Sequence, residues 1–427
     1  MPGGGAGDVA RPRTQARGRR RRQATSLPLD VVLAIAARSD AATVIRCAAT
    51  CADVRRRVVD DPTFGGRLRL RHIDRFVLPL LRGHLIERRT GSRDDNGLYL
   101  VDTAAAGATR LCRVPRAVPS GAAGEPMSLD SVTSRDGLLL LSLTDESTSP
   151  VLRVLCVRDP ATGRSLTLPT EPGFPRAAGS RADSYVLLVG DGEDGGAASA
   201  VGRPFQVLKA NLYSSHVRQH CFVQLQTFSS EHGEWGRYAE IPTPQLHGCY
   251  LSDEPLVVGG AVHWLCGNCV IKLRIRTARA NMTTLPASFP GETWCSRLLA
   301  MSADGNLMVL VADGKKISAW EQSKHTLIWK KQPWVVIEVD EILRFNNVVG
   351  LIEKPRYSSL GVRLIWFAER SGAVLIYIDY YGLFWLDLQS KKIVRWLDPQ
   401  KTRRLDTVYC PIERDLSSWV PTFSCTI

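Results

Sequence analysis

Residues 362–397 have the sequence VRLIWFAERSGAVLIYIDYYGLFWLDLQSKKIVRWL. Short apolar runs alternate with turn-forming pairs near Ser371-Gly372, Tyr381-Gly382 and Ser390-Lys391, which predicts four antiparallel strands. Four strands in about 36 residues is the size of one blade of a β-propeller. A single blade cannot bury both of its faces, so we expect several blades to stack around a common axis.

The same pattern of short strands and turns begins near residue 97 and extends toward the C-terminus. Strand-like runs include LYLVD, LLLLSL after Asp136-Gly137, YVLLV, FQVLKANL and CFVQLQTF. Gly267-Asn268 separates two apolar runs by two residues, which predicts a tight hairpin. At ~45 residues per blade, this region predicts six or seven blades. All ten tryptophans follow residue 234, so aromatic packing is expected mainly in the C-terminal half.

Residues 26–64 differ from the rest because their apolar spacing is helical. Pro28 suits the first turn of a helix, and Val31, Val32 and Ile35 follow at helical spacing. Further apolar positions predict a second and a third short helix, which Pro62 would end. Three helices of this size cannot bury a full core, so some of their apolar surface needs a partner.

This N-terminal stretch resembles an F-box, the docking module of SCF-type ubiquitin ligases. The matching positions are Leu27-Pro28-x-Asp30, Val31-Val32, Ile35, Arg38, Val44-x-Arg46-Cys47, Cys51, Arg55 and the Asp61-to-Phe64 ending. Val54 replaces the usual aromatic residue, and Ser39 stands where leucine is common. The resemblance implies that an SKP-type adaptor binds the residues Leu27, Pro28, Val32, Ile35, Val44, Cys47 and Val54. The alternative is an ordinary helical cap packed on the next domain.

The strand-rich region resembles the F-box-associated β domains of plant proteins, which are propeller-like or kelch-like. The resemblance rests on Asp136 to Leu141, Asp159-Pro160-Ala161-Thr162-Gly163 and Gly259 to Trp264. It implies a domain that binds the protein to be ubiquitinated. The predicted fold class is therefore mainly β with a small N-terminal α domain. We expect a disordered basic tail over 1–25, an F-box over 26–64, a linker over 65–95 and a propeller-like domain over 96–420.

The net charge of +13 at first suggests nucleic-acid binding, but almost half of this charge lies in the N-terminal tail. Residues 1–25 carry seven arginines and one aspartate, so the tail accounts for +6 and the rest of the chain is only mildly basic. The run Arg19, Arg20, Arg21 and Arg22 is a candidate nuclear-import signal or an electrostatic arm. The other interpretation is a solvated tail without a dedicated partner.

The eleven cysteines, without a secretory signal, predict reduced thiols in the nucleus or cytoplasm. No apolar run reaches the ~18 residues of a membrane span. A zinc site is the main metal alternative, with candidate ligands His247, Cys249, His263, Cys266 and Cys269. A second Cys-x-x-Cys is missing, so buried packing roles are favoured and no metal or other cofactor is expected.

Motifs of hydrolases and nucleotide-binding enzymes are also missing from the sequence. The sequence therefore predicts a non-enzymatic subunit that joins an SKP-type adaptor, and through it a cullin–RING ligase, to an unknown protein substrate. One alternative is a nuclear or nucleic-acid-associated scaffold that uses the arginine-rich tail. Another is a propeller enzyme or glycan binder with a vestigial F-box.

Overall fold

The structure is a computed structural model. It describes residues 27–36, 38–39, 47–48, 51–60, 76–88, 97–103, 108–113, 128–145, 152–160, 162–175, 183–189, 201, 204–215, 220–243, 251–252, 254–275, 277–290, 295–345, 361–397 and 407–413. The expected basic tail over 1–25, with Arg19, Arg20, Arg21 and Arg22, lies outside these residues, as does Val44.

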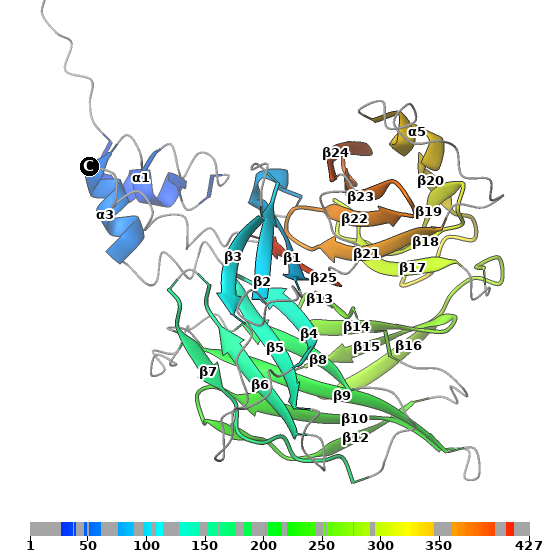
Figure 1. Cartoon of the computed structure of the whole chain (residues 1–427), viewed down its shortest axis with the longest axis horizontal. Helices are drawn as coiled ribbons and strands as arrows, with labels where there is room; N and C mark the ends of the chain where they lie inside the picture. The colour runs from blue at the N-terminus through cyan, green and yellow to red at the C-terminus, as the bar shows by residue number, and fades with distance from the viewer. Residues whose placement is uncertain are drawn as a thin grey trace, which may run out of the picture.

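Within the described residues, twenty-five strands form six antiparallel sheets that follow one another as the blades of a propeller (Figure 1). Blade 1 contains β1 (Leu81–Arg88), β2 (Gly97–Asp102) and β3 (Ala108–Arg113), joined by β25 (Thr407–Glu413). Blade 2 contains β4 (Ser128–Arg135), β5 (Leu138–Asp145), β6 (Leu152–Arg158) and β7 (Ser165–Thr167). Blade 3 contains β8 (Ser184–Val189), β9 (Phe205–Ser215), β10 (His220–Ser229), β11 (Glu234–Trp235) and β12 (Ala239–Thr243).

The other three blades have four strands each, in chain order. Blade 4 contains β13 (Leu256–Val258), β14 (Ala261–Cys266), β15 (Cys269–Arg274) and β16 (Arg279–Thr284). Blade 5 contains β17 (Ser296–Met301), β18 (Leu307–Ala312), β19 (Lys316–Gln322) and β20 (Trp334–Glu338). Blade 6 contains β21 (Val362–Ala368), β22 (Ala373–Ile378), β23 (Gly382–Asp387) and β24 (Lys392–Leu397).

The two ends of the β region close the ring together. Strand β25 pairs antiparallel with β1, with Leu81 opposite Glu413 and Glu87 opposite Thr407. Blade 1 therefore takes its innermost strand from the C-terminal part of the chain (red beside cyan in Figure 1). The innermost strands β25, β4, β17 and β21 contact their neighbours around the ring. Closure packs the faces of blades 6 and 1 together, which an open stack would leave exposed.

The sequence predicted the last blade in detail. Residues 362–397 form four strands with turns at the three expected places. The Gly267-Asn268 hairpin is also confirmed, because Cys266 pairs with Cys269 across a two-residue loop. Asp136 and Gly137 both have positive φ, 49° and 80°, as a tight hairpin turn requires. The predicted propeller boundary at residue 96 is too late, since β1 lies in the range expected to be a linker and belongs to blade 1.

Apolar side chains fill the spaces between neighbouring blades. The largest cluster joins blades 4, 5 and 6, and separate clusters lie between blades 1 and 2, 2 and 3, 3 and 4, and 6 and 1. Trp264 and Trp385, one from blade 4 and one from blade 6, are completely buried. Strands in a propeller are covered on both faces, so runs such as LLLLSL and AVLIYI are apolar almost throughout rather than alternating.

A buried ammonium group joins the segment after blade 2 to blade 3. Lys209 of blade 3 is almost inaccessible, and its Nζ lies 3.1 Å from Asp183 Oδ2 and 3.4 Å from Glu171 Oε2. Its Nζ also donates a hydrogen bond to the Pro172 carbonyl, at 3.1 Å. These contacts hold the segment after β7 against blade 3, because an unpaired buried ammonium would cost several kcal/mol.

A close approach at the turn between β21 and β22 involves Gly372. Its φ is +68°, and a Cβ at this position would lie 2.2 Å from Cδ1 of Phe76. The neighbouring Val77 N–H donates to the Arg370 carbonyl at 3.1 Å. The segment before β1 is thus packed on blade 6 at a place that only glycine allows.

His84 of β1 lies at the interface of blades 1 and 6. Its ring centroid is 6.0 Å from that of Trp385. Within the described residues, neither ring nitrogen has a hydrogen-bond partner. Burial, helped by the nearby Arg395 guanidinium, lowers the pKa of His84 to about 3. The imidazole is therefore neutral at physiological pH.

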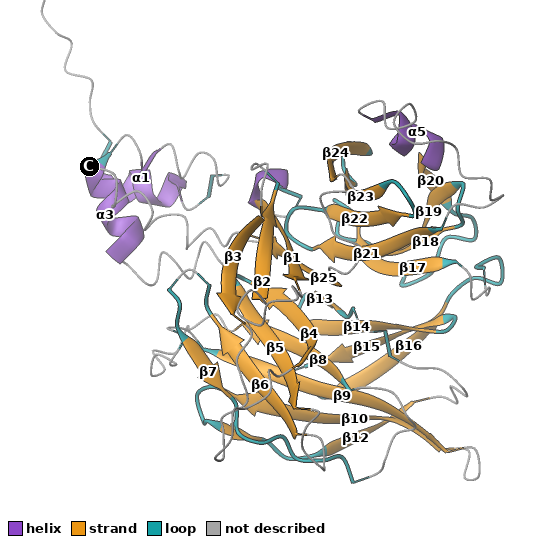
Figure 2. Cartoon of the chain, in the orientation of Figure 1, coloured by secondary structure: helices purple, strands orange, loops and turns teal. Residues whose placement is uncertain are grey.

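The described N-terminal helices lie beside the propeller, at the far side from β17–β24 (Figure 2). They are α1 (Leu29–Ala36) and α3 (Ala52–Asp60). Ala36, Val54 and Leu80 are completely or almost completely buried in one small cluster. Leu80 belongs to the 3-10 turn η2 (Leu78–Leu80) just before β1, so this turn packs against the helices. A further short helix, α5 (Val339–Arg344), follows β20. No helix among the described residues has the length and apolarity of a membrane span.

Candidate functional site

Helix α1 carries apolar side chains on more than one face. Its inner side contributes Leu29, Val32, Leu33 and Ala36 to the cluster with α3 and η2. Its outer side exposes Val31 and Ile35, with 42% and 49% of each residue accessible, and Leu27 just before the helix is 59% accessible. Residues four apart lie on the same face of a helix. We call Leu27, Val31 and Ile35 the α1 stripe.

The seven residues expected to bind an adaptor differ in their exposure to solvent. Leu27, Pro28 and Ile35 are exposed, whereas Val32 and Cys47 are half-buried. Val54 is completely buried between the helices and η2, so it supports their packing and is not a surface contact. Val44 lies outside the described residues. Val31 was missed because the run LDVVLAIA is apolar on both faces of the helix, so its spacing alone does not say which valine points inward.

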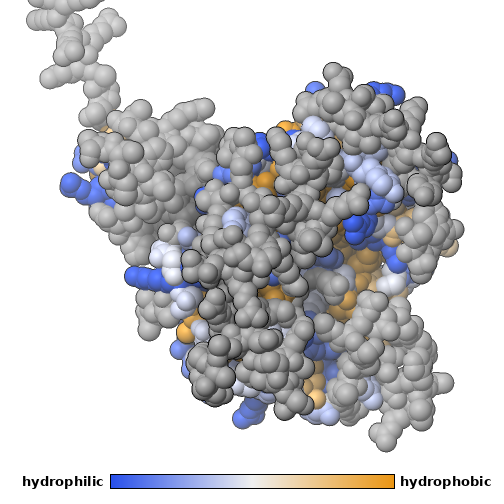
Figure 3. Space-filling model, viewed as in Figure 1, coloured by the Kyte–Doolittle hydropathy of each residue, from blue (hydrophilic) through white to orange (hydrophobic). Residues whose placement is uncertain are grey.

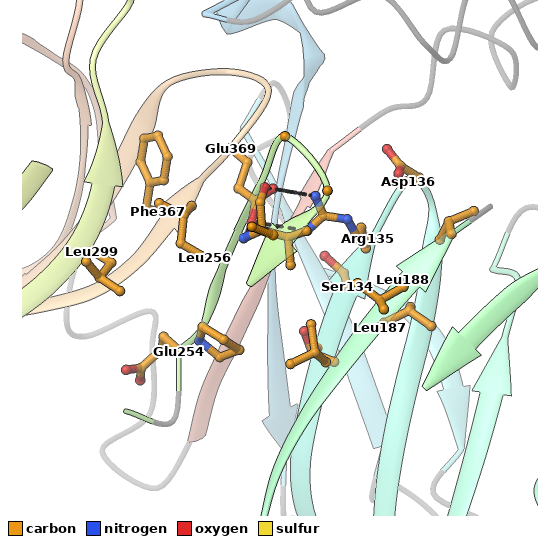
Figure 4. Close-up of a pocket in the computed structure, with 18 of the residues that line it drawn as sticks. Ser134, Arg135, Asp136, Leu187, Leu188, Glu254, Leu256, Leu299, Phe367 and Glu369 are labelled. Carbon is orange, nitrogen blue, oxygen red and sulfur yellow. Dashed lines mark hydrogen bonds and ion pairs between the residues drawn. The ribbon is translucent and has the colours of Figure 1, made fainter. Parts of the chain in front are cut away.

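The ends of the innermost strands line a cavity of about 770 Å³ in the centre of the ring. Its apolar wall includes Leu187 of β8, Leu256 of β13, Leu299 of β17 and Phe367 of β21 (Figure 4). Its polar side is built from Ser134, Arg135 and Asp136 at the end of β4 and from the residues that follow β21. Every blade contributes to this cavity, so it exists only when the ring is closed.

A bidentate ion pair crosses the cavity. Arg135 Nη2 lies 2.8 Å from Glu369 Oε2, and Arg135 Nη1 donates to Glu369 Oε1 at 3.1 Å (Figure 4). Arg135 Nη2 also donates to the Val257 carbonyl at 3.2 Å, and the Val257 N–H donates to Glu369 Oε1 at 3.1 Å. Burial alone would lower the pKa of Arg135, but the carboxylates of Glu369 and Asp136 raise it. The pair thus links blades 2, 4 and 6 as fixed charges.

A second polar group surrounds the end of β25. Glu413 accepts hydrogen bonds from the backbone N–H of Arg370 at 3.0 Å and of Ser371 at 2.6 Å, and from the Ser371 hydroxyl. Burial raises the pKa of Glu413, against the lowering effect of these donors. The Arg370 guanidinium is paired with Asp136. Glu413 therefore attaches the last strand of the ring to blade 6.

The charges at this end of the cavity are largely neutralised by one another. Arg135 is paired with Glu369, and Arg370 with Asp136. Both pairs join blade 2 to blade 6, which are far apart in sequence, so their role is structural. Among the described residues, no group of three or more histidine, cysteine, aspartate or glutamate side chains has the arrangement of a metal site. Of the five zinc candidates, His263 and Cys266 are buried in β14, Cys269 is half-buried at the start of β15, and His247 and Cys249 lie outside the described residues.

A family with the description "Domain of unknown function (DUF7595)" matches residues 101–424, which is most of the chain. The chain belongs to this family. The match covers the propeller from the end of β2 onward and does not include the N-terminal helices α1 and α3. No curated protein matches the chain.

Several solved structures match this chain at low sequence identity. A protein of unknown function from Bacteroides caccae is 12% identical, with a TM-score of 0.38, and the match covers 77% of this chain and 98% of that one. The β-propeller domain of the Trilobed protease from Pyrococcus furiosus is 6% identical, with a TM-score of 0.30, covering 62% and 69%. Kuenenia stuttgartiensis hydrazine synthase is 9% identical, with a TM-score of 0.45, covering 79% and 47%.

Proposed function

We propose that this protein is a substrate-recruiting subunit of an SCF-type ubiquitin ligase, in which the N-terminal helices bind an SKP-type adaptor and the propeller holds the protein to be ubiquitinated. The observation that carries the proposal is the α1 stripe. Its exposed aliphatic residues Leu27, Val31 and Ile35 lie in the stretch that resembles an F-box. A helix that turns apolar side chains both toward its neighbours and toward solvent is typical of a protein interface.

The stripe is large enough to contribute a useful share of the binding energy. Burial of an exposed aliphatic side chain contributes about 1.5–3 kcal/mol before the costs of association. The buried residues Ala36, Val54 and Leu80 hold α1 in place, so less ordering cost is expected on binding. Valine at position 54 supports the helical unit from within, and its replacement of an aromatic residue does not remove the exposed contacts.

In this proposal the chain itself performs no bond chemistry. Its contribution is to raise the effective concentration of target lysines near the charged ubiquitin-conjugating enzyme, which the cullin–RING assembly brings. A closed six-bladed ring suits this role because it is a rigid body whose rims and sides can hold a second protein. The proposed location is the nucleus, the cytoplasm or both.

Capture by a purified SKP-type adaptor tests the proposal. We expect the full chain to bind the adaptor, and Val31→Asp and Ile35→Asp to weaken binding at least about tenfold, since each places a charge in an apolar contact. Val394→Asp is the matched control, because Val394 is an exposed valine on β24 of blade 6. Equal binding by all variants, or no binding by the wild type, would contradict the proposal. Loss of adaptor binding on deletion of residues 1–25 would instead favour a role for the arginine-rich tail.

A further inference from the structure

Outside the N-terminal helices, the most exposed large apolar side chains in the described residues are Ile328 and Leu327, at 68% and 53% accessible. Both lie on the connection between β19 and β20 of blade 5. They border a hollow of about 730 Å³, whose other wall is the end of β16 and the turn after it, Thr283–Ser288 of blade 4. We call this hollow the blade 4–5 groove.

The loop that carries these two residues has a strained but well-supported conformation. Leu327 has φ of 57°, a left-handed conformation that is unfavourable for a bulky residue. The conformation is held by the Leu327 N–H, which donates to the Ser323 carbonyl at 2.8 Å, and by Gln322 Nε2, which donates to the Leu327 carbonyl at 2.9 Å. The loop therefore presents Leu327 and Ile328 to solvent in a fixed arrangement.

The next residue fixes the loop to blade 4. Trp329 is buried, and its Nε1 donates to Thr283 Oγ1 at 3.4 Å. On the far side, the Ser288 hydroxyl donates to the Lys331 carbonyl at 2.6 Å. These contacts hold the two walls at a set distance, so the groove is preformed and a ligand would pay little ordering cost there. Pro286 and Ala287 extend its apolar lining on the blade 4 side.

The two described segments that form the walls of the groove carry basic residues and no acidic ones. The connection 323–333, SKHTLIWKKQP, contains three lysines and no acidic residue. The opposite wall, 279–290, has the sequence RANMTTLPASFP, with one arginine and no acidic residue. Lys331 lines the groove, whereas Lys330 is paired with Glu321 on β19. An apolar hollow with a basic border is complementary to an apolar side chain that has acidic neighbours.

We propose that the blade 4–5 groove binds a linear peptide segment of the recruited protein, in which a bulky apolar residue is flanked by aspartate or glutamate. This inference rests on the proposed function, since it names the surface of the propeller that holds the target. The apolar residue enters between Ile328, Leu327 and Pro286. The acidic neighbours face Lys331 at the border of the groove.

Selection from a random peptide library displayed on phage, with the full chain as bait, tests the proposal. Enriched peptides are expected to combine leucine, isoleucine, phenylalanine or tryptophan with adjacent acidic residues. A fluorescent synthetic copy of an enriched peptide then gives a Kd by anisotropy for each variant. Ile328→Asp is expected to weaken binding about tenfold or more, because it removes the burial of one aliphatic side chain and adds an acidic charge. Lys331→Glu is expected to weaken the binding of acidic peptides and to reduce the salt dependence of that binding.

Two further variants keep the test decisive. Leu327→Gly removes an apolar side chain at a positive φ that glycine favours, so it should fold at least as well as the wild type yet bind the peptide more weakly. Val394→Asp, on the exposed side of blade 6, should bind the peptide normally. Absence of acidic–apolar enrichment, or enriched peptides that bind Ile328→Asp as well as the wild type, would overturn the proposal. Self-association that Ile328→Asp abolishes would also overturn it, because the groove would then hold a second copy of this chain.

The two proposals can fail separately. Ile328→Asp should leave adaptor capture unchanged, and Val31→Asp should leave peptide binding unchanged, because the α1 stripe and the groove belong to different parts of the chain. If Ile328→Asp loses peptide binding but still captures the adaptor, the substitution affects the groove alone. If the wild type does not capture the adaptor but binds the peptide through the groove, the propeller is a peptide-binding module that does not belong to a ligase.

Discussion

Replacement of His84 by leucine should make the protein less sensitive to acid. His84 is completely buried between blades 1 and 6 against Trp385, and its nitrogens have no hydrogen-bond partner among the described residues. Burial lowers the pKa of His84 from 6.5 to about 3. In the unfolded chain the His84 imidazole is therefore protonated below pH 6.5, whereas in the folded chain it is protonated only below about pH 3. The unfolding free energy therefore decreases as the pH falls from 6.5 to 3.

The size of the effect follows from the difference in pKa. Each pH unit within the window costs about 1.4 kcal/mol of unfolding free energy, so His84 should account for a loss of about 2 kcal/mol between pH 7.5 and pH 5. His263 adds a similar loss in both proteins, because burial and the nearby Lys272 lower its pKa to about 4. Leucine at position 84 also removes two polar atoms without partners, which should raise the stability at pH 7.5 by about 1–3 kcal/mol.

Urea unfolding followed by tryptophan fluorescence at pH 7.5 and pH 5 measures both effects. His84→Leu should lose about 2 kcal/mol less than the wild type between the two pH values, and His325→Leu, at an exposed position, should behave as the wild type. An unchanged loss in His84→Leu would refute the account of the pH dependence. A decrease of more than about 1 kcal/mol at pH 7.5 would show that the imidazole is hydrogen bonded, since such a loss is expected on removing a satisfied buried group.

Three further substitutions test the contacts that close the ring and join its blades. Glu413→Ala leaves the donors around it on blade 6 without their acceptor and should cost about 2–4 kcal/mol in urea unfolding, and Glu413→Gln, which keeps an acceptor, should cost less. Gly372→Ala should destabilise by more than about 2 kcal/mol because its Cβ would meet the Phe76 ring, whereas Gly233→Ala, at the same sign of φ in open space, should cost only about 1 kcal/mol; equal costs would contradict the proposed contact. Lys209→Met removes the buried ammonium that pairs with the half-buried carboxylates of Asp183 and Glu171 and should lower the unfolding free energy by about 2 kcal/mol, and a neutral effect would contradict this network.

Local sequence signals predicted the strands because every blade except blade 1 is built from strands that are consecutive in the chain. The turns of residues 362–397 and the Gly267-Asn268 hairpin required only short-range pairing. The strand pairing that closes the ring was not predicted, because β1 and β25 are separated by almost the whole β region and no local signal in either strand indicates its partner. A first strand or short helix was expected within the linker, but nothing in the sequence assigned it to blade 1.

The candidate sites show the same division. The helical spacing of residues 26–64 indicated apolar side chains that need a partner, but it did not decide between the two faces of α1, so Val31 was missed and Val54 was expected at the surface. The pairing of Arg135 with Glu369 brings together residues from blades 2 and 6, which only the closed ring allows. The groove also depends on contact between blades, since Trp329 of blade 5 meets Thr283 of blade 4.

Hydrogen–deuterium exchange of the full chain, with and without a purified SKP-type adaptor, tests the central functional claim most directly. The account predicts that the adaptor slows exchange of the backbone amides in α1 (Leu29–Ala36), while those of β21–β24 keep their rates. An adaptor that forms no complex, or one that protects only propeller strands and leaves α1 unchanged, would contradict it.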